Sequence, residues 1–106
     1  MLIMTNPEFG LVTADIIDED NVRSIAMVAV SGLNRPLINH RSDMEYEVTC
    51  GEGSMEVDFN VIELRRGSVV RIPAGTPYQD EAVTPRLVMR VTATPPFNPD
   101  DVEYLA

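Results

Sequence analysis

The fold of this chain is decided by the stretch Gly67-Ser68-Val69-Val70-Arg71-Ile72-Pro73-Ala74-Gly75-Thr76-Pro77-Tyr78. Gly67 marks a turn, because glycine adopts backbone angles that other residues avoid. The β-branched run that follows favours a strand. Pro73 and Pro77 fix φ and have no N–H to donate, so the strand is expected to end in a rigid bend. That bend delivers one polar aromatic side chain, Tyr78.

Short apolar runs separated by turn residues continue along the rest of the chain. A strand, the sequence Gly51-x-Gly53 and a second strand predict a hairpin. Asn98 followed by Pro99 has the chemistry of a helix cap, so residues 102–106 are expected to form one helical turn or a tail. The pattern predicts an all-β sandwich or barrel without a long helix. The predicted strands are residues 11–17, 24–30, 45–49, 54–59, 61–64, 69–72 and 86–92.

The predicted domain organisation is a single domain over residues 1–106, because no linker, repeat or low-complexity tract interrupts the pattern. Residues 1–10 are expected to form an N-terminal arm that ends in a turn at Gly10.

The composition argues against several kinds of partner. The net charge is −9, and the eight basic residues are all arginine. An acidic chain without a basic patch is not expected to bind nucleic acid or an anionic membrane. Cys50 is the single cysteine, which excludes an internal disulfide and a cysteine-cluster zinc site. No signal-peptide pattern and no run of about 20 apolar residues is present, so a cytoplasmic location is expected.

The spacing of Gly67, Pro73 and Gly75 is similar to the second conserved motif of the cupin family, G-x5-P-x-G-x2-H. Gly51-x-Gly53 resembles the end of the family's first motif, and residues 95–97 resemble its exit from the last strand. The resemblance covers residues 36–97. It implies a double-stranded β-helix, the jelly-roll barrel of the cupins, and commonly a homodimer.

The resemblance also shows where the family's metal site has changed. Cupins use three histidines and a glutamate, whereas this chain has one histidine. The matching positions hold poor ligands for iron, manganese or zinc. We therefore expect no metal cofactor. An atypical divalent-metal set remains the alternative, and it requires Glu45 to point inward. The four residues at the positions of the family's three histidines and one glutamate are Ile38, His40, Met44 and Tyr78.

A small-molecule pocket is the predicted use of the barrel. If Met44 points inward, alternation along the strand also turns Tyr46 inward and Glu45 outward. His40 has a reference pKa near neutrality, which suits a general base, although a loop histidine is an equal alternative. The sequence does not decide whether the side chain of Arg71 points into the barrel or out of it, because this depends on the register of its strand. The predicted ligand-binding residues are His40, Met44, Tyr46, Arg71, Tyr78 and Met89.

The favoured function is therefore a small cupin-domain protein that binds a small organic ligand without the usual metal. The first alternative is an enzyme, because His40 and Tyr78 resemble the acid and base of metal-independent epimerases and isomerases built on this fold. An atypical metal enzyme and an oligomerising accessory protein are further alternatives. The fold alone does not choose between them.

Overall fold

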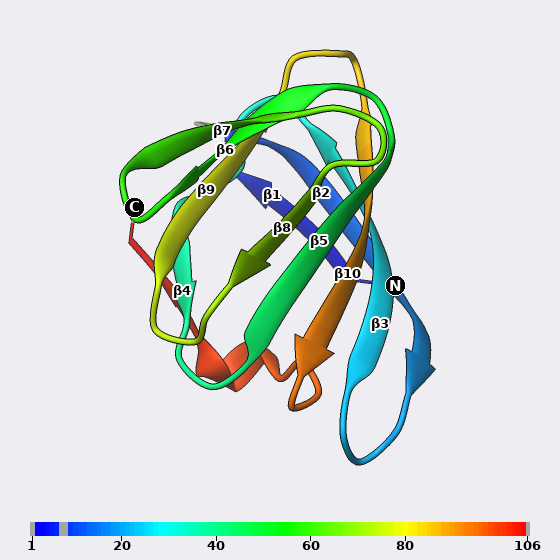
Figure 1. The fold of residues 1–106 in the computed structure, drawn as a ribbon, viewed down its shortest axis with the longest axis vertical. Helices are drawn as coiled ribbons and strands as arrows, with labels where there is room; N and C mark the ends of the chain where they lie inside the picture. The colour runs from blue at the N-terminus through cyan, green and yellow to red at the C-terminus, as the bar shows by residue number, and fades with distance from the viewer. Residues whose placement is uncertain (1, 7–8, 106) are drawn as a thin grey trace.

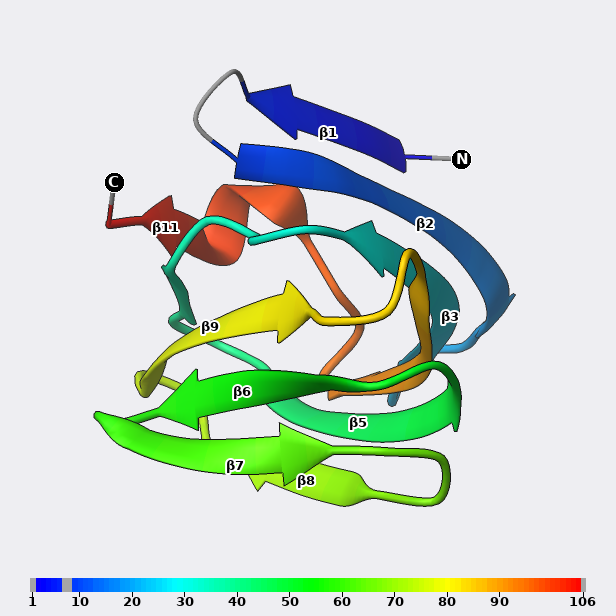
Figure 2. The ribbon, with the colours of Figure 1, turned by 90° about the horizontal axis from the view of Figure 1, so that it is seen from above.

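The computed structural model describes residues 2–6 and 9–105, which form two antiparallel sheets facing one another (Figures 1 and 2). The six-stranded sheet has the order β1 (Leu2–Asn6), β2 (Phe9–Glu19), β3 (Ser24–Ser31), β10 (Leu87–Thr94), β5 (Asp43–Cys50) and β8 (Val69–Ile72). The five-stranded sheet has the order β11 (Val102–Tyr104), β4 (Leu37–Asn39), β9 (Pro77–Ala82), β6 (Gly53–Val57) and β7 (Asn60–Leu64). The predicted all-β architecture is confirmed.

The bend between Gly67 and Tyr78 carries the chain from one sheet to the other. Gly67 and Gly75 have φ angles of 90° and 83°, in the left-handed region that favours glycine. The Gly75 N–H donates to the carbonyl of Asn39 at 2.8 Å, which ties the bend to β4. β8 ends at Ile72 in the six-stranded sheet, and β9 begins at Pro77 in the five-stranded sheet.

The predicted hairpin around Gly51 and Gly53 is wrong. β5 lies in the six-stranded sheet and β6 in the five-stranded sheet, so this connection also crosses between layers. The hairpin instead joins β6 to β7, through Asp58 and Phe59 with φ angles of 48° and 67°. Two positive φ values in a two-residue loop match the twist of antiparallel strands. Phe59, predicted as the end of a strand, is a turn residue and 83% exposed.

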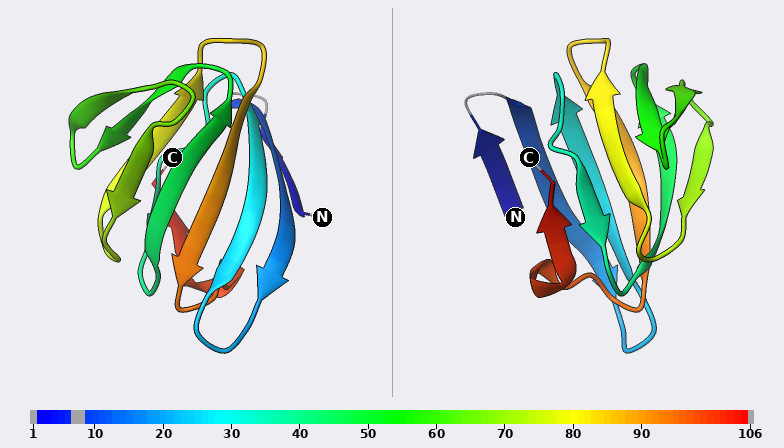
Figure 3. Two further views of the ribbon diagram at one scale, coloured as in Figure 1. Left: turned by 45° about the vertical axis from the view of Figure 1, so that its right-hand side comes forward. Right: turned by 90° about the vertical axis from the view of Figure 1, so that its left-hand side faces the viewer.

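The two ends of the chain also differ from prediction. Instead of a separate arm, β1 pairs with β2 at the edge of the chain's own sheet. β2 begins at Phe9, so Gly10 lies within a strand, and residues 7–8 lie outside the described residues. Asn98 caps a single 3-10 turn, Pro99–Asp101, as its sequence predicts. The residues after this turn form β11, which pairs with β4 (Figure 3).

The core between the sheets is filled by large side chains at one end. Met55, Leu64, Ile72, Leu87 and Met89 are at most 2% exposed, and they pack between the β6–β7 hairpin and strands β5, β8 and β10. Burying such side chains contributes roughly 1.5–3 kcal/mol each to folding. No helix among the described residues is long and apolar enough to cross a membrane.

Candidate functional site

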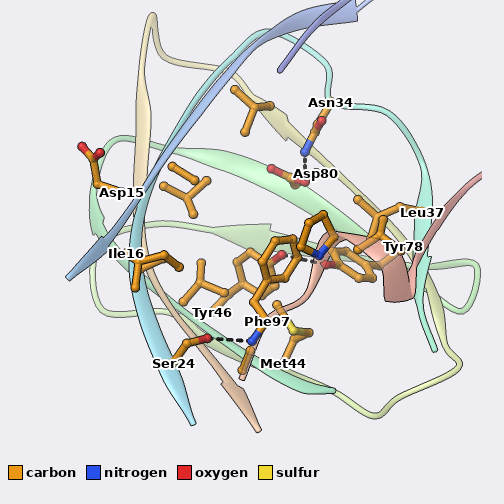
Figure 4. A pocket seen from close by; sticks show the side chains of 18 of the residues that line it. Asp15, Ile16, Ser24, Asn34, Leu37, Met44, Tyr46, Tyr78, Asp80 and Phe97 are labelled. Atoms are coloured by element: carbon orange, nitrogen blue, oxygen red, sulfur yellow. Dashed lines mark hydrogen bonds between the residues drawn. The ribbon is translucent and has the colours of Figure 1, made fainter. Parts of the chain in front are cut away.

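A cavity of about 440 Å³ lies at the other end of the space between the sheets (Figure 4). Here β2, β3 and β10 contribute the small residues Ala14, Ala26 and Ala93 to the wall, alongside Val12, Val28 and Val91. Because the alanine side chains are short, a space remains between the two sheets here. In the rest of the core, methionine and leucine side chains fill the corresponding space. Strands β4, β5, β9 and β11 complete the wall.

Two buried tyrosines face each other inside this cavity. The hydroxyl groups of Tyr46, on β5, and Tyr78, on β9, form a hydrogen bond of 2.7 Å (Figure 4). Their rings meet edge to face with centroids 5.6 Å apart. The pair has two hydroxyl hydrogens and uses one of them internally, so one remains for a ligand.

Burial keeps both phenols protonated at neutral pH. Loss of solvation raises the pKa of Tyr46 well above its usual value, and the neighbouring Tyr78 and Asp80 raise it further. Loss of solvation also raises the pKa of Tyr78, against the opposing effect of its hydrogen bond with Tyr46. Each hydroxyl is therefore a hydrogen-bond donor rather than a phenolate.

Asp80 is a further polar group in the cavity wall. It is 2% exposed, and its Oδ1 accepts a hydrogen bond of 3.0 Å from the side-chain amide of Asn34. Its Oδ2 is buried and has no hydrogen-bond partner. Burial raises the pKa of this carboxyl to about 6, with the Asn34 amide opposing the shift. A buried carboxyl with one unpaired oxygen is uncommon and calls for an explanation.

Sequence reasoning missed Asp80, because residues 79–82 are polar enough to resemble a loop. The structure extends β9 through Ala82, so alternation turns Tyr78, Asp80 and Ala82 to the inside. The alternation of Tyr78, Asp80 and Ala82 was visible in the sequence and was the signal that could have found the carboxyl.

Three of the predicted ligand-binding residues line this cavity. They are Met44, Tyr46 and Tyr78. The expected alternation along β5 is confirmed, since Met44, Tyr46 and Val48 are buried whereas Glu47 and Thr49 are exposed. Glu45 faces the opposite side of the sheet from Met44, where its carboxylate accepts a hydrogen bond of 3.0 Å from Arg71.

The structure does not bring His40, Arg71 and Met89 into the cavity wall. His40 follows the end of β4, is exposed, and its Nε2 lies 2.7 Å from Oε1 of Glu103. Arg71 points outward because its neighbours Val70 and Ile72 occupy the inner face of β8. Met89 is fully buried in the filled end of the core. The expected contact of these residues with a ligand has no support from the cavity geometry.

The family's metal set does not fit the residues at this site. His40 is directed to Glu103, and the hydroxyl of Tyr78 is hydrogen-bonded to that of Tyr46. Met44 is a buried thioether, and Ile38 offers no donor. Within residues 2–6 and 9–105, no group of three or more histidine, cysteine, aspartate or glutamate side chains could hold a metal ion. We therefore derive no chemistry through a metal.

The charged residues that line the cavity are all acidic. Asp80 lies inside, and Asp15 and Glu19 contribute from β2; the described lining includes no arginine or histidine. Arg35 lies close by, but its guanidinium carbon sits 4.1 Å from the centroid of the Tyr104 ring. The electrostatic field of these carboxylates disfavours a phosphate or carboxylate in the cavity.

Comparison with solved structures identifies the class of fold. A histidine-to-glutamine variant of Streptomyces Pac13, solved with uridine, matches with a TM-score of 0.79 at 19% identity, over 96% of this chain and 82% of Pac13. KdgF from Halomonas sp. matches at 0.76 and 15% identity, over 94% of this chain and 90% of KdgF. The cupin domain of Schizosaccharomyces pombe Cnp3 matches at 0.72 and 11% identity, over 90% of this chain and 69% of that domain.

These structures show that the chain has the cupin jelly-roll fold, as its sequence resemblance implies. At such identities the match concerns the fold alone. No family model matches the sequence. No curated protein matches it either.

Proposed function

We propose that this protein binds a small, uncharged organic molecule in the cavity between its sheets, without the metal that other cupins use. The observation that carries this proposal is the buried Tyr46–Tyr78 hydroxyl pair facing a cavity of about 440 Å³. Small-molecule sites have this size, and they combine a mostly apolar wall with a few polar groups that orient the ligand.

The preference for an uncharged ligand follows from the lining. A phosphate would meet Asp80, Asp15 and Glu19 without a basic side chain in the described cavity wall to neutralise it. The tyrosine pair supplies a hydrogen-bond donor, and Asp80 supplies an acceptor. These groups suit a molecule that carries both carbonyl and hydroxyl groups.

The structural neighbours suggest the first probe. Pac13 is described as a unique nucleoside dehydratase, and tyrosine-to-phenylalanine variants of it were solved with uridine. A nucleoside is uncharged and carries both carbonyl and hydroxyl groups, which is the class that this cavity favours. Uridine therefore serves as a probe for this chain.

We expect uridine to raise the melting temperature of the protein and uridine monophosphate to raise it much less. A ligand that binds only the folded state stabilises it by mass action, and phosphate repulsion removes that effect. Differential scanning fluorimetry over a concentration series measures both shifts. An equal or larger shift with the monophosphate would contradict the uncharged-ligand proposal. No shift with uridine or with a panel of neutral ketones, alcohols and sugars would overturn ligand binding itself.

Variants locate the binding site. Tyr78→Phe removes one hydroxyl and is expected to weaken probe binding about fivefold, since a hydrogen bond contributes roughly 1 kcal/mol. His40→Ala is the matched control, because His40 lies outside the cavity wall and its loss should leave binding unchanged. A large effect of His40→Ala with none from Tyr78→Phe would place the ligand elsewhere.

Filling the cavity should abolish binding without unfolding the protein. Ala26 lines the cavity, whereas Ala29, on the same strand, does not. We expect Ala26→Leu to occupy the ligand's volume and to remove the thermal shift caused by the probe, while Ala29→Leu keeps it. Isothermal titration of both variants measures this, with circular dichroism to confirm folding. Retained binding by a folded Ala26→Leu variant would rule out this cavity.

A further inference from the structure

We propose that Asp80 is a general base in a metal-free site that transfers a proton at the carbon beside a substrate carbonyl, with the Tyr46–Tyr78 hydroxyl pair binding the carbonyl oxygen. The substrate class is an uncharged ketone or aldehyde that has a hydrogen on this α-carbon. This inference rests on the proposed function, because the cavity must first bind the substrate.

The carboxyl of Asp80 is held in place through one oxygen, and its other oxygen is buried in the cavity wall without a hydrogen-bond partner. Its Oδ1 accepts from the Asn34 side chain, and the Asn34 backbone N–H donates to the Asp80 carbonyl at 2.9 Å. The side chain of Gln79 donates to the Asn34 carbonyl at 2.8 Å, which fixes Asn34 in turn. Oδ2 of Asp80 is left without a hydrogen-bond partner. An anchored carboxylate with one free oxygen is the geometry that a general base needs.

The hydroxyl pair lies where it can act on the same bound molecule. Tyr78 and Asp80 are two residues apart on the inner face of β9, so their Cα atoms are about 7 Å apart. Tyr46 reaches the same point from β5 in the facing sheet. A carbonyl group can therefore accept the free tyrosine hydrogen while its α-carbon faces Asp80. Fixed donors in a cavity of low polarity stabilise the negative charge that develops on such an oxygen.

The proposed step balances without any further reactant. The α C–H bond breaks, and its proton moves to Oδ2 of Asp80, which becomes a carboxylic acid. The electron pair forms a carbon–carbon double bond, and the carbonyl oxygen becomes an enolate oxygen that accepts the tyrosine hydrogen bond. Return of a proton from Asp80 to the same carbon restores the carbonyl. If solvent has exchanged the proton on Asp80, the product carries the solvent isotope.

The protonation states agree with these roles. A pKa of about 6 makes Asp80 a carboxylate at neutral pH and a stronger base than an ordinary aspartate. Tyr46 from β5, Tyr78 from β9 and Tyr104 from β11 all have a raised pKa, so they remain neutral and can donate. Asp15 and Glu19 line the same cavity from β2 and add no positive charge.

Deuterium exchange into cyclohexanone tests the inference. The protein is incubated with cyclohexanone in D₂O, and α-deuteration is followed by NMR above the rate of buffer alone. We expect exchange that rises with pH through about 6 and then levels off. Asp80→Asn should lower the rate at least about 100-fold, and Tyr78→Phe at least about tenfold. Glu81→Gln is the matched control, because Glu81 is exposed on the same strand and its loss should change nothing.

Saturation-transfer NMR of cyclohexanone on each variant separates the possible failures. Binding without exchange above buffer, or exchange retained by Asp80→Asn, would overturn the inference and leave ligand binding intact. No binding to the wild-type protein would overturn the inference for this substrate class. Together with the absence of any thermal shift from the ligand panel, it would overturn the proposed function as well. Circular dichroism of Asp80→Asn confirms that the variant is folded.

Discussion

Replacing Asp80 by asparagine is expected to raise the free energy of unfolding by about 3 kcal/mol at pH 7.5 and to leave it nearly unchanged at pH 3.5. The reason is that burial raises the folded-state pKa of Asp80 to about 6 from a reference value of 3.8. The folded protein therefore favours the protonated carboxyl, whose contribution to stability is full below about pH 3.8. This stabilisation is lost as pH rises through about 6. Its size follows from the difference between the folded and unfolded pKa values, at about 1.4 kcal/mol per unit.

Urea unfolding of the wild type and Asp80→Asn over a pH series measures this difference. The asparagine amide is neutral at every pH and keeps an oxygen for the Asn34 hydrogen bond. Glu81→Gln, on the exposed face of the same strand, should show no comparable pH-dependent gain. If Asp80→Asn is no more stable than the wild type at pH 7.5, the carboxyl is not held as a buried anion. Asp80 could then not serve as the general base in the deuterium-exchange experiment.

Gly53→Ala is expected to destabilise the protein by more than about 3 kcal/mol, or to prevent folding. A Cβ at this position would lie 2.1 Å from the backbone oxygen of Glu81 and 3.1 Å from Cδ2 of Leu87. Gly53 pairs with Ala82, so relieving the clash requires β6 to separate from β9. Overpacking against backbone is among the mechanisms behind the largest single-residue effects on stability.

Gly75→Ala is the matched comparison for Gly53→Ala. Its φ of 83° is unfavourable for alanine, but no atom lies within 4 Å of the added Cβ. The expected loss is about 1–2 kcal/mol, the usual cost of a left-handed residue with a side chain. Chemical denaturation of the two variants tests the contrast. Equal losses would mean that β6 and β9 do not approach each other as closely as the structure shows.

Much of the fold was predictable because its signals are local. Glycine and proline set backbone angles wherever they occur, so the bend ending at Tyr78 could be placed without the rest of the molecule. Alternation along β5 likewise placed Met44 and Tyr46 on the inner face, because side chains of a strand alternate whatever surrounds it. The sheet to which each strand belongs was not predictable. The connection between Cys50 and Gly53 was therefore predicted as a hairpin, whereas it crosses from one sheet to the other.

The candidate site was predictable only in part. Its two tyrosines could be found because they lie on strands with clear alternation. Asp80 was missed, because the polar residues 79–82 resemble a loop and outweighed the alternation of Tyr78, Asp80 and Ala82 that marks the continuing strand. His40 was placed inside by analogy with a family motif, whereas the chain leaves β4 before reaching it and turns it toward Glu103.

By itself, the sequence from Gly67 to Tyr78 determined a strand and a bend, since these depend on backbone angles within a few residues, and its resemblance to a cupin motif implied the fold. The tertiary structure decided that this bend joins two sheets, and that the hydroxyl of Tyr78 meets that of Tyr46. It also decided that a cavity exists at all. Ala14, Ala26 and Ala93 are far apart in the sequence, and the space they leave forms only when pairing between strands brings three short side chains to one place.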